Sequence, residues 1–188
     1  MGQYYYPCSI EKKQHVYSHD YGNGLKLMEH SWIGNGFVEI VENLIKKGGA
    51  WFKDRIVWAG DYADNEKGRK KNLHTICENN KTTPSPYVRK KGEQKLRFLV
   101  NLDTNEYVDL NKVPVTEVYV RKDEKTGKKS KTVYRIHPLP ILTCEGNGRG
   151  GGDYHGNSNL VGRWARNRVI MQKNKPNNKT ELIFDLVE

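Results

Sequence analysis

The sequence predicts an α+β fold with an antiparallel-rich sheet, one clear amphipathic helix and glycine-rich ligand loops. The helix is indicated over about 35–47, because apolar side chains recur there with the helical period (Phe37, Val38, Ile40, Val41, Leu44 and Ile45). Short apolar segments separated by turn residues predict the strands. Six glycines within residues 146–156 predict the main ligand loop.

The first half of the chain is expected to form two strands around this helix. Residues 3–10 are rich in strand-forming aromatic side chains. Asn35 is the expected N-cap of the helix, and Gly48-Gly49 ends it. Residues 55–59 predict a buried strand, which ends at Gly60-Asp61-Tyr62.

The second half is expected to consist mainly of hairpins. Three are predicted from apolar segments flanking turn residues: 96–102 with 106–110, 115–121 with 131–136, and 168–172 with 181–187. Residues 137–140 (His-Pro-Leu-Pro) are expected to be extended, because the residue before a proline avoids the α region. One or two helical turns are expected within 160–168.

The chain is interpreted as a single domain, residues 1–188, with two additions. One is a basic insert at about 64–95, expected to be a loop or a weak helix over roughly 65–79, followed by an extended linker. The other is an exposed hairpin at about 115–136. The length of 188 residues is typical of one domain.

The charge favours an anionic partner. The formal net charge is +10, and residues 51–100 carry twelve basic and six acidic side chains. Clusters at 67–71 and 89–91 would attract nucleic acid or a nucleotide. The alternative is that these clusters form a solvated loop that keeps the protein soluble.

Other partners are not indicated. A mean hydropathy of −0.85, without a long apolar run, predicts no membrane contact and a cytoplasmic location. Three widely spaced cysteines without a CxxC pair predict reduced thiols. No local spacing of histidines suggests a metal, and no cofactor is expected.

The glycine-rich segment has the composition of a phosphate-binding loop. Gly148, Gly150 and Gly151 could present backbone amides to phosphate, and Arg149 could add charge-assisted hydrogen bonds. The segment lacks the Gly-Lys-Ser/Thr end of a P-loop, so the pattern does not identify the ligand.

Aspartate and aromatic residues could complete a nucleoside site. Gly-Asp-Tyr occurs twice, so Asp61 and Asp153 could bind ribose hydroxyls while Tyr62 or Tyr154 stacks on the base. Two further ligand-binding candidates lie just before the helix: Trp32, as another stacking residue, and His30. The alternative is that the aspartates cap turns and the aromatic rings pack in the core.

An enzymatic role is left open, and binding without turnover is favoured. His19 and His155, with Asp153, are the residues that could perform acid–base catalysis, because they lie in polar, turn-rich segments. The sequence holds no nucleophile elbow, so covalent catalysis has no support.

Several blocks resemble a family of small, largely uncharacterised proteins of bacteriophages and mobile elements. They are Met1-Gly2-Gln3-Tyr4-Tyr5, residues 24–35 with His30-Ser31-Trp32-Ile33-Gly34-Asn35, Trp58-Ala59-Gly60-Asp61-Tyr62-Ala63, and residues 137–140 leading to 146–154. The resemblance covers most of the chain except 64–95 and 121–131. It implies a phage protein that acts in the host cytoplasm.

These observations lead to one expectation and two alternatives. The expected function is sequestration of a phosphate-containing nucleotide messenger, such as a cyclic nucleotide or an ADP-ribose derivative, as a phage counter-defence sponge. The first alternative is a phosphodiesterase or hydrolase that cleaves such a messenger. The second is a nucleic-acid-binding accessory protein that uses 67–71 and 89–91. A homodimer is compatible with each.

Overall fold

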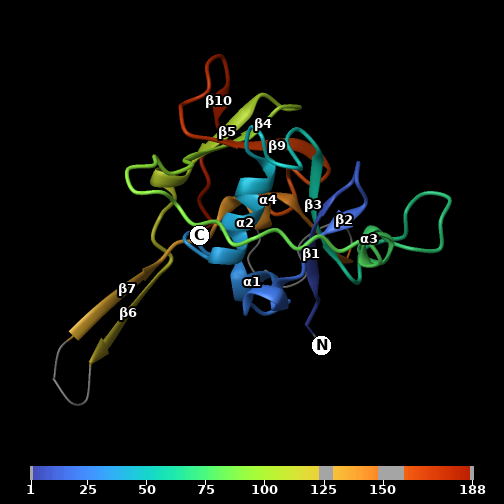
Figure 1. Cartoon of the computed structure of the whole chain (residues 1–188), viewed down its shortest axis with the longest axis horizontal. Helices are drawn as coiled ribbons and strands as arrows, with labels where there is room; N and C mark the ends of the chain where they lie inside the picture. Colours follow the sequence, from blue (N-terminus) through green and yellow to red (C-terminus); the bar gives the residue numbers. More distant parts are fainter. Residues whose placement is uncertain (1, 123–128, 148–158, 187–188) are drawn as a thin grey trace.

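A mostly antiparallel sheet forms the centre of the protein (Figure 1). The computed structural model describes residues 2–122, 129–147 and 159–186. Within these residues the main sheet has eight strands: β1 (Tyr5–Ser9), β2 (Gln14–His15), β3 (Arg55–Gly60), β4 (Phe98–Asn101), β5 (Glu106–Asp109), β8 (Cys144–Glu145), β9 (Asn167–Gln172) and β10 (Thr180–Glu181). The predicted α+β class is confirmed.

The strand order joins segments that are distant in the sequence. The order is β10-β5-β4-β9-β3-β1-β2, and β8 pairs with β3 off this path. Most pairs are antiparallel, whereas β8 runs parallel to β3 and β10 runs parallel to β5. Strand β9 therefore connects β4 on one side with β3 on the other.

Four α-helices accompany the sheet in the described residues: α1 (Leu27–His30), α2 (Gly36–Ile45), α3 (Leu73–Glu78) and α4 (Pro138–Thr143). Two short 3-10 helices are η1 (Ser18–Tyr21) and η2 (Leu110–Lys112). Helix α2 matches the predicted amphipathic helix, and the Asn35 side chain accepts from the backbone N–H groups of Phe37 and Val38 as its N-cap. The apolar face of α2 packs in one core with Trp58 and Trp164.

Helix α4 corrects the expectation that residues 137–140 are extended. Pro138 and Pro140 occupy the first turn of α4, where a backbone N–H has no partner within the helix and proline costs little. His137 caps the helix, because its Nδ1 accepts a hydrogen bond from Leu139 N at 3.1 Å. All six residues of α4 are buried, so tertiary packing outweighs the local preference of residues before proline.

The predicted hairpin of 168–172 with 181–187 is also wrong. Both edges of β9 are occupied, by β4 and by β3. The C-terminal segment instead pairs in parallel with β5, and Leu182 N donates to Tyr107 O at 2.8 Å. Residues 160–166 form turns and no helix, and 167–168 begin β9.

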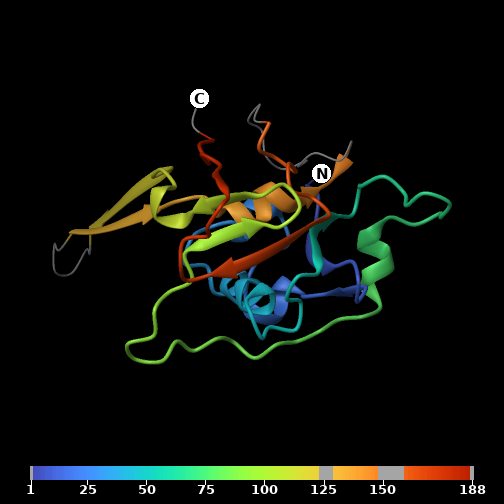
Figure 2. The same ribbon diagram turned by 90° about the horizontal axis from the view of Figure 1, so that it is seen from above.

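The other two predicted hairpins are present. Strands β4 and β5 pair in the main sheet. Strands β6 (Glu117–Lys122) and β7 (Lys129–Tyr134) form a separate two-stranded ribbon, which projects away from the rest of the molecule (Figures 1 and 2). The weak helix expected over 65–79 is confined to α3. Among the described residues, no helix has the length and apolar character needed to cross a membrane.

Candidate functional site at the ends of β3 and β8

The parallel pairing of β3 and β8 brings two of the sequence motifs together. In the register, Trp58 is opposite Cys144 and Ala59 is opposite Glu145. The chain therefore leaves both strands at the same edge, as Gly60-Asp61-Tyr62 on one side and Gly146-Asn147 on the other. Gly146 and Asn147 are the described start of the glycine-rich segment. The carboxyl ends of parallel strands are a common place for ligand binding.

Gln3 links the two motifs. With its amide oriented to satisfy its neighbours, Gln3 accepts from the backbone N–H groups of Tyr62 at 3.1 Å and Asn147 at 3.2 Å, and it donates to the Tyr5 hydroxyl. Gln3 is almost completely buried. A Cβ atom on Gly60 would lie 2.8 Å from this amide, so the close approach requires glycine there. The edge is thus held in a defined conformation.

Asp61 and Tyr62 lie next to this link and differ in exposure. The Asp61 carboxylate accepts from Tyr4 N at 3.1 Å, and Asp61 N donates to Tyr4 O at 2.9 Å. Asn72 Nδ2 donates to Asp61 O at 2.8 Å and helps to fix the turn. Tyr62 is 50% exposed. Asp61 therefore has the turn-stabilising role of the alternative interpretation, while Tyr62 presents a ring to solvent.

An arginine clamp lies behind the edge. Arg166 donates to both carboxylate oxygens of Glu145 at 2.6 Å, and its Nη1 donates to Glu66 at 2.9 Å. The Glu145 side chain is only 3% exposed. These two carboxylates raise the pKa of Arg166 above its usual value. Because the charge of Arg166 is compensated, the clamp positions residues 145–147 and does not offer a free cation to a ligand.

His30, predicted as a ligand residue, lies in the core. Trp58 Nε1 donates to His30 Nε2 at 2.9 Å, so Nδ1 carries the proton and donates to Gly24 O at 3.1 Å. The side chain is fully buried, and burial lowers its pKa to about 4. Both ring nitrogens are used and no ligand can reach them, which corrects this prediction.

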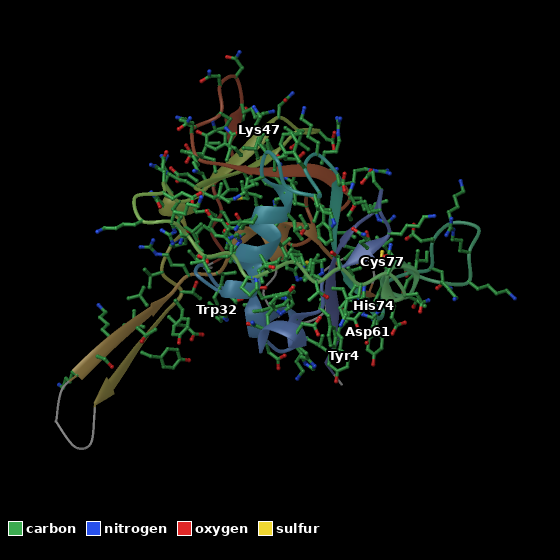
Figure 3. The ribbon with its side chains drawn as sticks, viewed as in Figure 1. Tyr4, Trp32, Lys47, Asp61, His74 and Cys77 are labelled. Atoms are coloured by element: carbon green, nitrogen blue, oxygen red, sulfur yellow. The ribbon has the colours of Figure 1, made fainter. Side chains whose placement is uncertain are left out.

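Trp32, the other predicted stacking residue, is not brought to this edge either. Its Nε1 donates to Met28 O at 2.9 Å, and its ring packs on Tyr134 at the root of the ribbon, with 5.3 Å between centroids. Figure 3 shows Trp32 and Asp61 well separated across the molecule. The structure therefore assigns Trp32 to a different surface.

Most of the remaining candidate residues lie outside the part of the chain that the structure describes. Residues Gly148, Arg149, Gly150, Gly151, Asp153, Tyr154 and His155 lie outside the described residues. His19 is exposed on η1, where its Nδ1 lies 3.1 Å from the Tyr17 hydroxyl. Its described partner is thus a tyrosine and not an aspartate.

A buried aromatic stack near this edge was missed from the sequence. The Tyr6 ring lies between His15 and His74, with centroids 4.6 and 4.0 Å apart. Burial lowers the pKa of His74 to about 4, and within the described residues its Nε2 has no hydrogen-bond partner. Tyr6 is opposite Ala59 in the pairing of β1 with β3, one residue before Gly60. The stack depends on α3 docking against β1, for which the local sequence has no signal.

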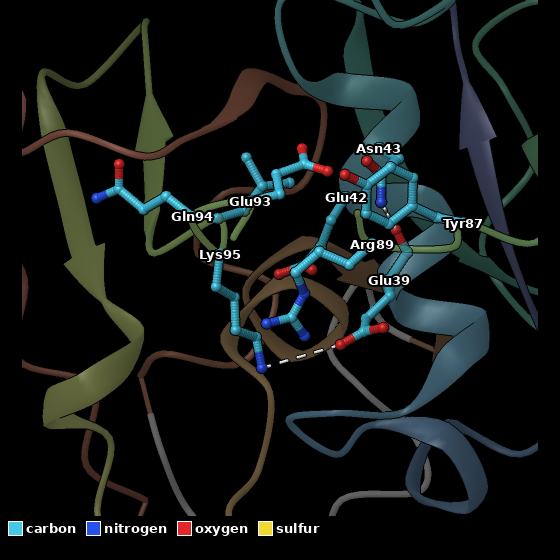
Figure 4. A pocket seen from close by; sticks show the side chains of 9 residues that line it. Glu39, Glu42, Asn43, Tyr87, Arg89, Glu93, Gln94 and Lys95 are labelled. Atoms are coloured by element: carbon cyan, nitrogen blue, oxygen red, sulfur yellow. Dashed lines mark hydrogen bonds and ion pairs between the residues drawn. The ribbon is translucent and has the colours of Figure 1, made fainter. Parts of the chain in front are cut away.

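Two hollows flank helix α2 and were also missed. Figure 4 shows a pocket between α2 and the segment 87–96, where Lys95 approaches Glu39 at 3.8 Å and both acidic and basic side chains contribute to the lining. A broader groove lies at the end of α2, with Leu96 and Met171 in its lining and three lysines around them: Lys46, Lys47 and Lys173. The first is electrostatically mixed, whereas the second is basic.

Comparison with known proteins adds no relative. No family model matches this chain, and no significant similarity links it to a curated protein or a solved structure. The resemblance to phage proteins therefore stays a prediction. Among the described residues, no group of three histidine, cysteine, aspartate or glutamate side chains could hold a metal ion.

Proposed function

We propose that this protein binds a small phosphate-containing ligand of the nucleotide class at the ends of β3 and β8. One observation carries the proposal: the parallel pairing of these strands puts Asp61 and the exposed ring of Tyr62 beside Gly146-Asn147, where the glycine-rich segment begins. An acid, an aromatic ring and backbone amides are the parts that a nucleotide site needs.

Each part has a chemical role in this proposal. The Tyr62 ring stacks on the base, and such stacking is worth about 1–3 kcal/mol. The Asp61 carboxylate has two oxygens with several lone pairs, so it can accept from ribose hydroxyls in addition to Tyr4 N. The amides of the glycine-rich segment and Arg149 contact the phosphate, where a charge-assisted hydrogen bond adds about 1.5–3 kcal/mol.

Sequestration is preferred to hydrolysis as the outcome of binding. The described residues at this edge include Asp61 but no histidine hydrogen-bonded to it, and His19 pairs with Tyr17 instead. General acid–base catalysis needs a second group within reach of the reacting atoms. We therefore retain the messenger-binding, counter-defence role as the proposal and hydrolysis as its alternative.

The test is native mass spectrometry and calorimetry with a panel of cyclic dinucleotides, ADP-ribose derivatives and NAD. Wild-type protein is expected to retain one class of ligand intact. Tyr62→Ala is expected to weaken its binding by about 5- to 150-fold, the equivalent of the lost stacking energy. Tyr119→Ala, which removes a similarly exposed ring on the ribbon, is the matched control and should bind normally.

The outcomes separate the alternatives. Unchanged affinity in Tyr62→Ala would contradict the proposed site. A ligand recovered as product would establish the hydrolase, and Arg149→Ala would then show whether the glycine-rich segment contacts the phosphate.

A further inference from the structure

The β6–β7 ribbon is an arm that the rest of the molecule does not cover. Its two strands pair only with each other, from Glu117 opposite Tyr134 to Lys122 opposite Lys129. Residues 117–119 and 129–133 are exposed, so both faces of this part of the ribbon contact solvent. Figures 1 and 2 show the ribbon extending well beyond the main sheet in both views. The core of the fold does not require such an extension, since the ribbon buries little of its own surface.

The root of the arm is fixed to the body. Tyr134 packs edge-on against Trp32 with centroids 5.3 Å apart, and Tyr119 packs edge-on against Tyr134 at 5.4 Å. Ile33 N donates to Arg135 O at 2.9 Å, and Trp32 forms a β-bridge with Ile136. This anchoring means that the ribbon is presented in a set direction, which reduces the entropy lost on binding a partner.

The charge of the arm is strongly positive. Residues 115–135 contain seven lysines and arginines against three acidic residues. Lys129 and Lys131 are exposed on one face of β7, and neither forms an ion pair with any described residue. Glu117, the acidic residue of the described ribbon, interacts instead with the Tyr119 hydroxyl. The lysines are therefore free to meet negative charge from outside.

The same face also carries apolar groups nearer the root. Val133 follows Lys129 and Lys131 at alternate positions of β7, and Val118 is opposite Val133 in the register. Both valines are exposed, at 45% and 48%. A partner that fits this face must carry dense negative charge for the lysines and small apolar groups for the two valines.

We propose that the β6–β7 ribbon inserts into the major groove of duplex DNA. Two strands about 5 Å apart, with their side chains, fit a groove about 12 Å wide and 8.5 Å deep, which is known to admit a two-stranded ribbon. The lysines contact phosphates at the groove edges, and Val118 and Val133 can meet thymine methyl groups. An A-form RNA duplex is excluded as the preferred target because its major groove is too narrow for side chains.

This interaction is distinct from the nucleotide site. The ribbon arises beside Trp32, whereas Asp61 lies across the molecule from Trp32 (Figure 3). Loss of one activity should therefore leave the other intact. Tyr62→Ala is expected to bind DNA as the wild type does, whatever ligand the edge of β3 and β8 takes.

The test measures binding of the full-length protein to a short fluorescent DNA duplex by anisotropy, between about 50 and 200 mM salt. The variant Lys129→Glu/Lys131→Glu is expected to bind at least tenfold more weakly. The slope of log affinity against log salt should also become shallower by about 2, since each lost phosphate contact removes about one unit. The control Lys13→Glu/Lys53→Glu makes the same change of net charge at two exposed lysines outside both the ribbon and the basic insert, and it should retain the wild-type slope.

Three results would overturn the proposal: no duplex binding at the lower salt concentration, equal losses in the two double variants, or tighter binding of a single strand or an RNA duplex of the same sequence. Equal losses would mean that only net charge matters. Because the substituted side chains are exposed, both variants should fold, and matching thermal transitions will confirm that binding losses are not unfolding.

Discussion

At the scale of single residues, two buried histidines limit stability in acid. His30 lies between Trp58 and Gly24, and His74 stacks on Tyr6 with centroids 4.0 Å apart. Burial lowers the pKa of each side chain from 6.5 to about 4. Each is therefore neutral in the folded protein at a pH where the unfolded chain already binds a proton.

We expect the free energy of unfolding to fall as the pH decreases from about 6.5 to about 4, since in this window the unfolded state holds more protons than the folded state. The stability that the two neutral histidines allow is fully present above pH 6.5, and it is lost as the pH falls to about 4. His74→Phe keeps a ring on Tyr6 but removes one titrating group. It should reduce the slope by up to about 1.4 kcal/mol per pH unit, measured by urea unfolding between pH 4 and 7.

The matched control is His19→Phe, which changes an exposed histidine. An identical slope in His74→Phe and the wild type would show that His74 titrates alike in both states, contrary to its burial.

These histidines also show how far the role of a single residue can be predicted from the sequence. The position of His30 before a helix could be predicted, but its partner Trp58 comes from a strand 28 residues further along. The sequence therefore suggested a ligand residue where the fold has a core residue. Asp61 and Tyr62 were identified correctly as lying at a strand end, because Gly60 gives a local signal.

At the scale of elements, the helices and strands that could be predicted are those with a periodic pattern of apolar residues in the local sequence. Helix α2 could be predicted because its apolar periodicity and its Asn35 N-cap are both local features of the sequence. Helix α4 could not be predicted, because its two prolines disfavour a helix in the sequence. The helix forms because its residues are buried in the core. Strand β8 has only two residues and no periodic signal. The candidate site depends on β8. The sequence therefore identified several residues of the site but could not predict that they come together.

The Arg166 clamp holds this short strand in place. Arg166→Ala removes the guanidinium that pairs with the buried Glu145 carboxylate, and breaking such a pair costs about 3–5 kcal/mol. We expect a loss of that size in the free energy of unfolding, measured by denaturant titration. Arg55→Ala is the control, because its pair with Glu11 is exposed and should contribute less than about 1 kcal/mol.

The double variant Arg166→Ala/Glu145→Gln tests the cause of this loss. It also removes the buried negative charge of Glu145, so it should recover part of the stability. If Arg166→Ala and Arg55→Ala were equally mild, the clamp would not hold β8, and another contact would have to position Gly146-Asn147.

At the scale of the whole molecule, the sheet interleaves the two halves of the chain. Strand β3, from the first third of the sequence, lies between β1 and β9, and β9 lies between β3 and β4. The core likewise combines Phe37 and Trp58 with Leu139 and Trp164. Such non-local pairing leaves no trace in a single sequence, which is why the antiparallel class could be predicted but not the strand order.

This interleaving predicts how the protein responds to a cut. Residues 82–97 contain no helix or strand, and Arg89, Lys90 and Lys91 are exposed there. Brief trypsin treatment should cleave early at this cluster, because exposed irregular backbone opens most readily. The cut separates β1, β2 and β3 from β4, β8 and β9, yet β3 remains paired with both β8 and β9.

The two fragments are therefore expected to stay together. Size-exclusion chromatography should show the nicked protein eluting at the volume of the intact protein, while a denaturing gel shows two bands. Fragments that separate on the column would mean that the contacts of β3 with β8 and β9 are too weak to join the halves. In that case the edge that presents Asp61, Tyr62 and Asn147 would not be held together by the sheet, and the proposed nucleotide site would lose its structural basis.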